Sequence, residues 1–372
     1  MKRIKKGQLT LVLISIILTL VLAETGLRLL QGLNYFPHFF KALNSAYTPF
    51  DTKTGEGLYY SHPYISYDMK PGYNIPGEVT INSHGYRGEE FALEKPPGTY
   101  RIVALGGSTT YGISLNDNET YPYYLQRELR KRLGDDKIEV INAGLVSATT
   151  AESLARFLLK IVPLEPDMVI FYEGYNDLPP RMFNDYSYDY YHFRKNPRYE
   201  FSLLSDSILY RLIVSGFKAS LHYPNTILLS QIWKFENLPK EDGKKIENFN
   251  ATSSAVYERN LDYIITVAKA KNISIALSTF AFDDDAPNWN DYMPDILWAK
   301  GINENNAAIR KLAEKYRLPI IEFYEYGLRN KQIFEDSVHM TAEGNEEMAK
   351  VFSDTLAPII EQEMNIGSRG GH

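Results

Sequence analysis

The sequence predicts an α/β fold with a mostly parallel five-stranded sheet, preceded by a transmembrane helix. Short apolar runs alternate with segments of helical spacing from residue 100 onward. That alternation is typical of a parallel sheet covered by helices on both faces. The run Arg101–Leu105 ends at two glycines, as a buried parallel strand does where it enters a tight turn.

Five strands and four helices follow from these patterns. The strands are expected at 101–105, 138–142, 167–172, 273–278 and 319–322, and the helices at 121–133, 149–162, 303–316 and 341–361. Between about 180 and 250 the alternation lapses and tyrosines accumulate. We interpret this stretch as an insertion, with helices around 205–221 and 226–235.

The N-terminus predicts the location of the protein. Lys2, Arg3, Lys5 and Lys6 precede an uncharged apolar run, Leu9–Ala23. This pattern fits either a cleaved signal peptide or a retained signal anchor. As a helix, the stretch between Lys6 and Arg28 spans about 30 Å, so we favour the anchor. The basic cluster stays cytoplasmic, which places the main domain outside, in the periplasm or at the cell surface.

Four regions result. Residues 1–30 form a cytoplasmic tip and a single-pass membrane anchor, and residues 31–98, rich in Tyr, Gly and Pro, form a stalk with a small β lead-in. The main domain covers residues 99–362 and includes the insertion. Residues 363–372 are expected to be a flexible tail.

Composition excludes several classes. The chain has no cysteine, which excludes disulfides, thiol nucleophiles and cysteine-bound metals. Its net charge is −6, so no overall positive field is available to hold nucleic acid.

Four short motifs follow expected strands in chain order. Gly106-Gly107-Ser108 lets the backbone turn sharply and leaves a serine at the end of the strand, near backbone amides that can bind an oxyanion. Asn142-Ala143-Gly144 follows the next strand, and its last residue could offer an amide to the same place.

The other two motifs supply an amide side chain and an acid–imidazole pair. In Gly174-Tyr175-Asn176-Asp177, Asn176 offers a neutral donor. In Asp336-Ser337-Val338-His339, the spacing of three lets the carboxylate orient the imidazole, which can then take a proton from Ser108. Each motif alone also fits an ordinary turn. Together they fall at the carboxyl edge of the sheet, where open α/β sheets place ligands.

The four motifs together resemble the SGNH/GDSL hydrolase superfamily, in particular its membrane-tethered bacterial esterases, over about residues 100–361. The resemblance implies a flavodoxin-like three-layer α/β/α fold. It also implies a catalytic triad of Ser108, Asp336 and His339, and an oxyanion hole made by Ser108, Gly144 and Asn176. It implies no metal and no organic cofactor. One position departs from the pattern, because the family often has Asp where this chain has Gly107.

The expected activity is hydrolysis of a carboxylic ester through an acyl-enzyme, on an acylated glycan, lipid or small ester of the cell envelope or extracellular space. Transfer of an acyl group to a surface polysaccharide and a non-catalytic glycan-binding role on the same fold remain as alternatives. Asp283-Asp284-Asp285 could bind a divalent cation, although such runs are more often solvated loops.

Overall fold

A computed structural model describes residues 6–33, 35–36, 58–194, 207–210, 212, 233–286 and 292–369. The chain divides into two compact units, Met1–Ser61 with Asn196–Ile232, and His62–Lys195 with Trp233–His372. The β lead-in from His62 onward therefore groups with the sheet, whereas the sequence suggested a boundary near residue 98. Most of the two helices expected at 205–221 and 226–235 lies outside the described residues.

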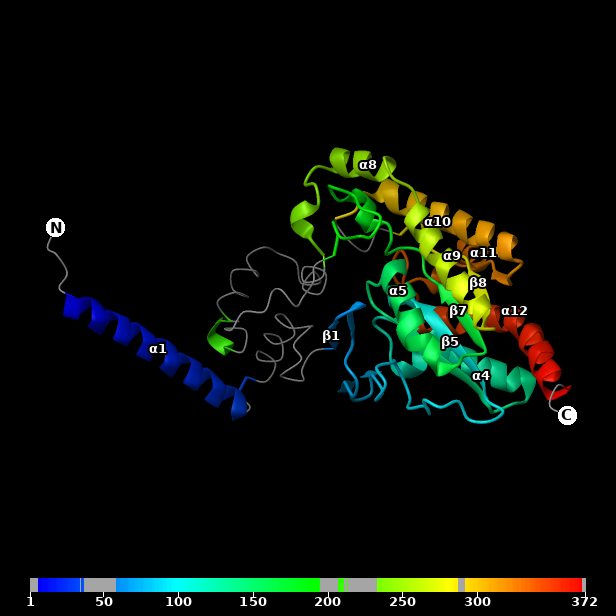
Figure 1. Cartoon of the computed structure of the whole chain (residues 1–372), viewed down its shortest axis with the longest axis horizontal. Coiled ribbons are helices and arrows are strands. Elements are labelled where there is room, and N and C mark those ends of the chain that lie inside the picture. The colour runs from blue at the N-terminus through cyan, green and yellow to red at the C-terminus, as the bar shows by residue number, and fades with distance from the viewer. Residues whose placement is uncertain are drawn as a thin grey trace. The chain divides into compact units, whose positions relative to one another are not determined.

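The larger unit contains the expected five-stranded sheet, drawn as arrows in Figure 1. Its strands are β5 (Tyr100–Gly106), β6 (Ile138–Gly144), β7 (Met168–Tyr172), β8 (Ser274–Ser278) and β9 (Ile320–Ile321). They lie in the order β6-β5-β7-β8-β9, and every pairing is parallel. This is the flavodoxin-like order, with its switch point between β5 and β7. The predicted fold class is confirmed.

The strand register brings the motif-bearing ends to one level. Gly106 at the end of β5 is paired with Gly144 of β6 and with Tyr172 of β7. The residues that follow these three strands therefore emerge together at the carboxyl edge of the sheet.

Helices cover both faces, because side chains along each strand alternate between two apolar cores. One core packs Ile102 and Ile170 against α4 (Tyr121–Leu133) and α12 (Ala342–Arg369). The other packs Val103 and Val169 against α9 (Ala255–Ala270), the second half of α10 (Asp295–Tyr316) and the π-helical turn Phe157–Ile161 that continues α5 (Thr150–Arg156).

Shorter elements complete the unit. They are β2 (Ser66–Met69), β3 (Asn74–Ile75) and β4 (Val79–Thr80) in the lead-in, α3 (Ser108–Tyr111), α8 (Asp242–Asn250) and α11 (Phe323–Arg329). β1 (Tyr59–His62) includes the sequence boundary between the two units, which falls after Ser61. β3 and β4 pair antiparallel.

Two helices are longer than expected. α10 begins at Asp295, directly after Pro294, rather than near residue 303. α12 continues to Arg369, whereas the sequence predicts that the helix ends near 361 and that a flexible tail follows from 363. Glu363 explains part of this, because its carboxylate accepts hydrogen bonds from the Tyr100 hydroxyl and from Ser274 Oγ, which tie the end of α12 to the sheet.

The smaller unit contains α1 (Lys6–Gly32), shown in blue in Figure 1. Thr10–Gly32 is an apolar stretch of 23 residues, long enough to cross a bilayer, and none of its most apolar part is buried. Such a helix near the N-terminus is either a membrane anchor or a signal sequence.

Candidate active site

Ser108 stands at the switch point of the sheet, as the first residue of α3. The two preceding glycines lie close to neighbouring groups. A Cβ at Gly106 would lie 2.2 Å from the carbonyl oxygen of Tyr172, and one at Gly107 would lie 2.6 Å from Asn176 Nδ2. The contact with a backbone oxygen requires a glycine at position 106, whereas a side chain at position 107 would displace only the end of the Asn176 side chain. Ser108 itself remains partly exposed between buried neighbours, so a substrate can reach it.

His339 and Asp336 complete a relay with this serine. Ser108 Oγ lies 2.8 Å from His339 Nε2, and His339 Nδ1 lies 2.7 Å from Asp336 Oδ2. The other carboxylate oxygen of Asp336 accepts the amides of Val338 and His339, at 2.8 and 2.7 Å. The carboxylate is thus fixed by its own turn, and the imidazole is oriented toward the serine across 231 positions of sequence.

The pKa of Asp336 is lowered. Burial by itself would raise it, but the hydrogen bond and charge of His339 and the amides of His339 and Val338 together outweigh burial. The carboxyl group is therefore an anion at neutral pH, as the orientation and stabilisation of an imidazolium require.

Asn176 lies beside the serine turn, because its Nδ2 is the atom that would meet a Cβ at Gly107. Within the described residues its amide has no protein hydrogen-bond partner. The next residue fixes the turn: Asp177 is buried, and its carboxylate accepts bonds from Thr150 N at 2.8 Å, Thr150 Oγ1 at 2.6 Å and the Tyr190 hydroxyl at 2.8 Å. Asn176 is thus held in place and left free to donate.

Gly144 reaches the same edge, but its amide is already used. The Gly144 N–H donates to Asn142 Oδ1 at 3.0 Å. A Cβ at this position would lie 2.1 Å from Tyr111 N, so the glycine lets α3 pack directly on β6. This geometry argues against the expected role of Gly144 as an oxyanion donor and gives it a packing role.

Sequence reasoning missed two residues that hold the loop between β6 and α5. The Tyr67 hydroxyl donates to Val146 O at 2.5 Å, and Arg194 Nη2 donates to Ser147 O at 2.8 Å. Ser147 is buried and has a φ of 62°, which a non-glycine residue adopts only when its surroundings impose it. Tyr67 comes from the lead-in and Arg194 from the start of the insertion, so no local pattern marks either residue.

Three acidic side chains are buried behind the site. Glu152 is paired with Arg194, and Asp177 and Glu173 lie near it. Burial and then the charge of Asp177 raise the pKa of Glu173 well above its usual range. Burial also raises the pKa of Asp177, to about 6, against the lowering effect of its bonds from Thr150 and Tyr190. Ser153 Oγ donates to Glu173 Oε2 at 2.8 Å, while Oε1 has no hydrogen-bond partner among the described residues.

The cavity beside the serine is small, about 10 Å³. It is lined by Gly107, Ser108, Thr109, Glu173, Gly174, Tyr175, Asn176, Phe280 and Val338. A space of this size is close to the minimum that holds one water molecule.

The acidic run Asp283-Asp284-Asp285 adjoins the turn that carries His339, because the Asp283 amide donates to Ser337 O at 3.0 Å, and it has a protein cation of its own. The Lys331 ammonium pairs with Asp283 at 3.4 Å and Asp284 at 2.6 Å, and with Asp285. The lysine supplies the positive charge that a metal would otherwise bring.

A doubly wound parallel sheet with a serine, an imidazole and a carboxylate aligned at its switch point defines an α/β enzyme that acts on ester bonds. The model of the GDSL-like lipase/acylhydrolase family matches residues 104–347, and the chain belongs to that family. The search of curated proteins gave no match.

Solved structures with a similar fold include three esterases or lipases. A lipase/acylhydrolase from Enterococcus faecalis is 16% identical, with 70% of this chain and 96% of that chain covered and a TM-score of 0.44. The acetyl xylan esterase AlAXEase is 17% identical, with 68% of this chain and 98% of that chain covered and a TM-score of 0.41. An acetylxylan esterase from Geobacillus stearothermophilus is 15% identical, with 70% of this chain and 96% of that chain covered and a TM-score of 0.43. At these identities the likeness concerns the fold alone.

Proposed function

We propose that this esterase removes short acyl groups, acetyl above all, from an acylated substrate outside the cell, through an acyl-enzyme on Ser108. His339 takes the proton of the Ser108 hydroxyl as Oγ attacks the ester carbonyl, and Asp336 stabilises the resulting imidazolium. The imidazolium then protonates the leaving alcohol. Water, deprotonated by His339, releases the acid and restores the serine. The 2.8 Å contact between Ser108 Oγ and His339 Nε2 is the observation that carries this proposal.

Two donors are proposed to hold the oxyanion. The Ser108 amide stands at the first position of α3, where an N–H has no partner within the helix. The Asn176 side chain is the second donor, held by the buried anchor at Asp177. Both are neutral, so they stabilise a negative charge as it develops without attracting a permanent anion.

The small cavity supports a short acyl group. About 10 Å³ accommodates a methyl-sized group, whereas a fatty acyl chain would have to lie on the outer surface or displace Phe280. Gly174 packs directly on the Phe280 side chain, because a Cβ there would lie 2.7 Å from the ring atom Cγ. The wall formed by Phe280 and Gly174 is therefore fixed, which favours small acyl groups.

A retained anchor with a cytoplasmic N-terminus is the proposed topology. The basic cluster Lys2–Lys6 favours that orientation. α1 continues without a break beyond Ala23, and Glu24 is engaged with another segment of the smaller unit. Its carboxylate accepts bonds from Ser207 Oγ at 2.9 Å and from Leu209 N at 2.9 Å. Protease protection and the size of the mature protein in a membrane fraction test this arrangement.

The enzymatic proposal is tested by fluorophosphonate labelling and by turnover of p-nitrophenyl acetate. The Ser108→Ala variant is expected to lose labelling and to lose turnover by roughly 10⁴-fold or more. Ser83→Ala, an exposed serine in the same unit, serves as the matched control and is expected to behave as the wild type. Undiminished turnover by folded Ser108→Ala would reject the nucleophile. An acceptor glycan that diverts the acetyl group from water would point to transfer instead of hydrolysis.

A further inference from the structure

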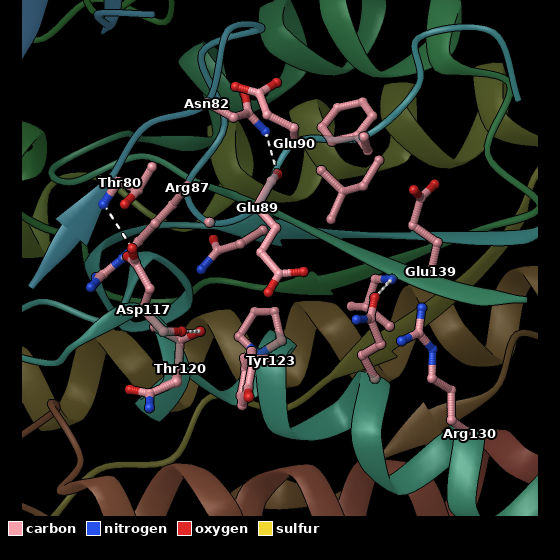
Figure 2. A pocket seen from close by; sticks show the side chains of 18 residues that line it. Thr80, Asn82, Arg87, Glu89, Glu90, Asp117, Thr120, Tyr123, Arg130 and Glu139 are labelled. Atoms are coloured by element: carbon pink, nitrogen blue, oxygen red, sulfur yellow. Dashed lines mark hydrogen bonds and ion pairs between the residues drawn. The ribbon is translucent and has the colours of Figure 1, made fainter. Parts of the chain in front are cut away.

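A second cleft lies along the outer edge of strand β6 (Figure 2). Its volume is about 350 Å³, at the lower end of the range of roughly 300–1,000 Å³ for small-molecule sites. The lead-in, the loop before α4, the near side of α4 and residues 139–142 of β6 form its walls. It shares no lining residue with the cavity at Ser108, so it is a separate site.

One end of this cleft is closed by a fully bonded ion pair. Arg87 is 4% exposed, and its Nε donates to Asp117 Oδ1 at 2.9 Å. Asp117 Oδ2 accepts the Thr80 amide at 2.8 Å, and Arg87 Nη1 donates to Tyr111 O at 2.8 Å. These groups are satisfied within the protein and form a rigid wall that also reaches the far end of α3.

The long side of the cleft is equally fixed. β6 is an edge strand, and side chains of α4 occupy its outward backbone groups: Gln126 Oε1 accepts the Val140 amide at 2.8 Å, and Arg130 Nε donates to Ile138 O at 2.7 Å. The strand edge is thereby protected from pairing with another chain. Because the walls are held by these bonds, a ligand would meet a preformed surface and would order few side chains.

The groups left without a partner decide what this surface can bind. Among the described residues, the Glu89 carboxylate, the Tyr123 hydroxyl, the Asn118 amide and the two terminal nitrogens of Arg130 have no protein hydrogen bond. Figure 2 shows the Glu89 carboxylate reaching into the middle of the cleft from the lead-in, with Tyr123 on the facing wall and Arg130 at the opposite end from Asp117. The set mixes donors with acceptors, and its two unpaired charges are of opposite sign.

A ligand with many hydroxyl groups and no net charge matches this set. Each hydroxyl both donates and accepts, so it can bond to a carboxylate, an amide or a guanidinium. The half-buried Tyr123 ring adds an apolar face with a polar end, which suits a sugar ring. A fatty acyl chain would leave these polar groups unpaired, and an anionic ligand would meet Glu89.

We propose that this cleft binds an uncharged segment of a carbohydrate chain, as a second contact for a polymeric glycan whose ester is cleaved at Ser108. The role in catalysis rests on the proposed function, whereas the binding itself does not. The cleft would raise the affinity for a polymer that reaches both sites and would leave a small ester unaffected.

Binding is measured first, without catalysis. Full-length Ser108→Ala protein in detergent is titrated with xylohexaose, cellohexaose and chitohexaose. We expect at least one to bind, and we expect Glu89→Ala or Tyr123→Ala to weaken that binding about fivefold or more, the effect of losing one hydrogen bond or ring contact. Lys131→Ala, an exposed residue of α4 that does not line the cleft, is the matched control. Failure of all three sugars to bind at roughly 10 mM, or equal affinity in the cleft variants, overturns the proposal.

Kinetics separate this proposal from the proposed function. With the native serine, the Glu89→Ala, Tyr123→Ala double variant is expected to raise KM for an acetylated polymer of the bound sugar about fivefold or more. Its turnover of p-nitrophenyl acetate should stay within about twofold of the wild type. Equal losses on both substrates would mean that the double substitution damages the fold. The same two measurements on Glu89→Ala alone, a change at an exposed residue, would then test the proposal. An enzyme inactive on every ester would refute the proposed function while the sugar titration still tests the cleft.

Discussion

The loop before α12 and the loop after β7 each carry an aspartate of the candidate site, and the pKa values of Asp336 and Asp177 are shifted in opposite directions. Asp336 is half-buried and its pKa is lowered, because His339 and two amides outweigh burial. Asp177 is buried, and its pKa is raised to about 6, because burial and the charge of Glu152 outweigh three hydrogen bonds. The comparison shows that neighbouring charge, and not burial alone, decides in which direction the pKa of a carboxyl group in these loops shifts.

The largest expected effect comes from Asp336, whose pKa is lowered. Asp336→Asn keeps the size of the side chain but cannot favour the tautomer that accepts the serine proton. We expect kcat for p-nitrophenyl acetate to fall by roughly 10³–10⁴ with little change in melting temperature. Asp177→Asn, the matched change in the other loop, should lose far less activity. Similar losses in the two variants would contradict the distinction between the loops.

A smaller effect is expected at the donor that the second loop carries. Asn176→Ala removes one of the two proposed oxyanion donors, and kcat should fall by roughly 10²–10³ with KM nearly unchanged. Gly144→Ala is a poor control, because the added Cβ would displace α3. A variant whose KM rises while kcat is kept would show that Asn176 binds the ground state rather than the oxyanion.

The smallest expected effect is on stability and tests the raised pKa. Because the pKa of Asp177 is about 6 in the folded protein and about 3.9 in an unfolded chain, its protonated form favours folding. This contribution is present below about pH 4 and is lost as pH rises through about 6, by about 3 kcal/mol at most. Asp177→Asn imitates the protonated form, so its stability relative to the wild type should improve between pH 4 and pH 7.

Urea unfolding of both proteins at the two pH values measures this difference. Glu173→Gln provides the companion measurement, since the pKa of Glu173 is also raised, by burial and then by the charge of Asp177. A stability difference between Asp177→Asn and the wild type that does not change with pH would show that Asp177 is ionised in the fold throughout.

Much of the sheet could be predicted because buried parallel strands are marked by continuous apolar runs. The run at Arg101–Leu105 became β5, and the strand expected at 138–142 became β6 with two more residues. Boundaries that depend on distant contacts could not be predicted. Tyr100 and Ser274 hold the last part of α12 through Glu363, and the sequence around Glu363 does not predict either contact.

The site shows the same division. Short motifs identify the residue types at 108, 176, 336 and 339. Because each motif follows an expected strand, their order along the chain predicts that they lie at one edge of the sheet. The hydrogen bond from the Gly144 amide to Asn142 could not be predicted, because it depends on the side-chain conformation of Asn142. Tyr67 and Arg194 were missed for a related reason: each contacts a backbone carbonyl far away in sequence.

By itself the sequence determined the alternation of strands and helices, the apolar N-terminal helix and the chemical groups available for catalysis, since all of these depend on local composition and spacing. Only the tertiary structure decided that Ser108 and His339 meet at 2.8 Å, which amides near them have no protein partner among the described residues, and in which direction the pKa values of the nearby acids shift. Distances between segments and the surroundings of buried charges arise from packing across the sheet, and packing is a property of the whole folded chain.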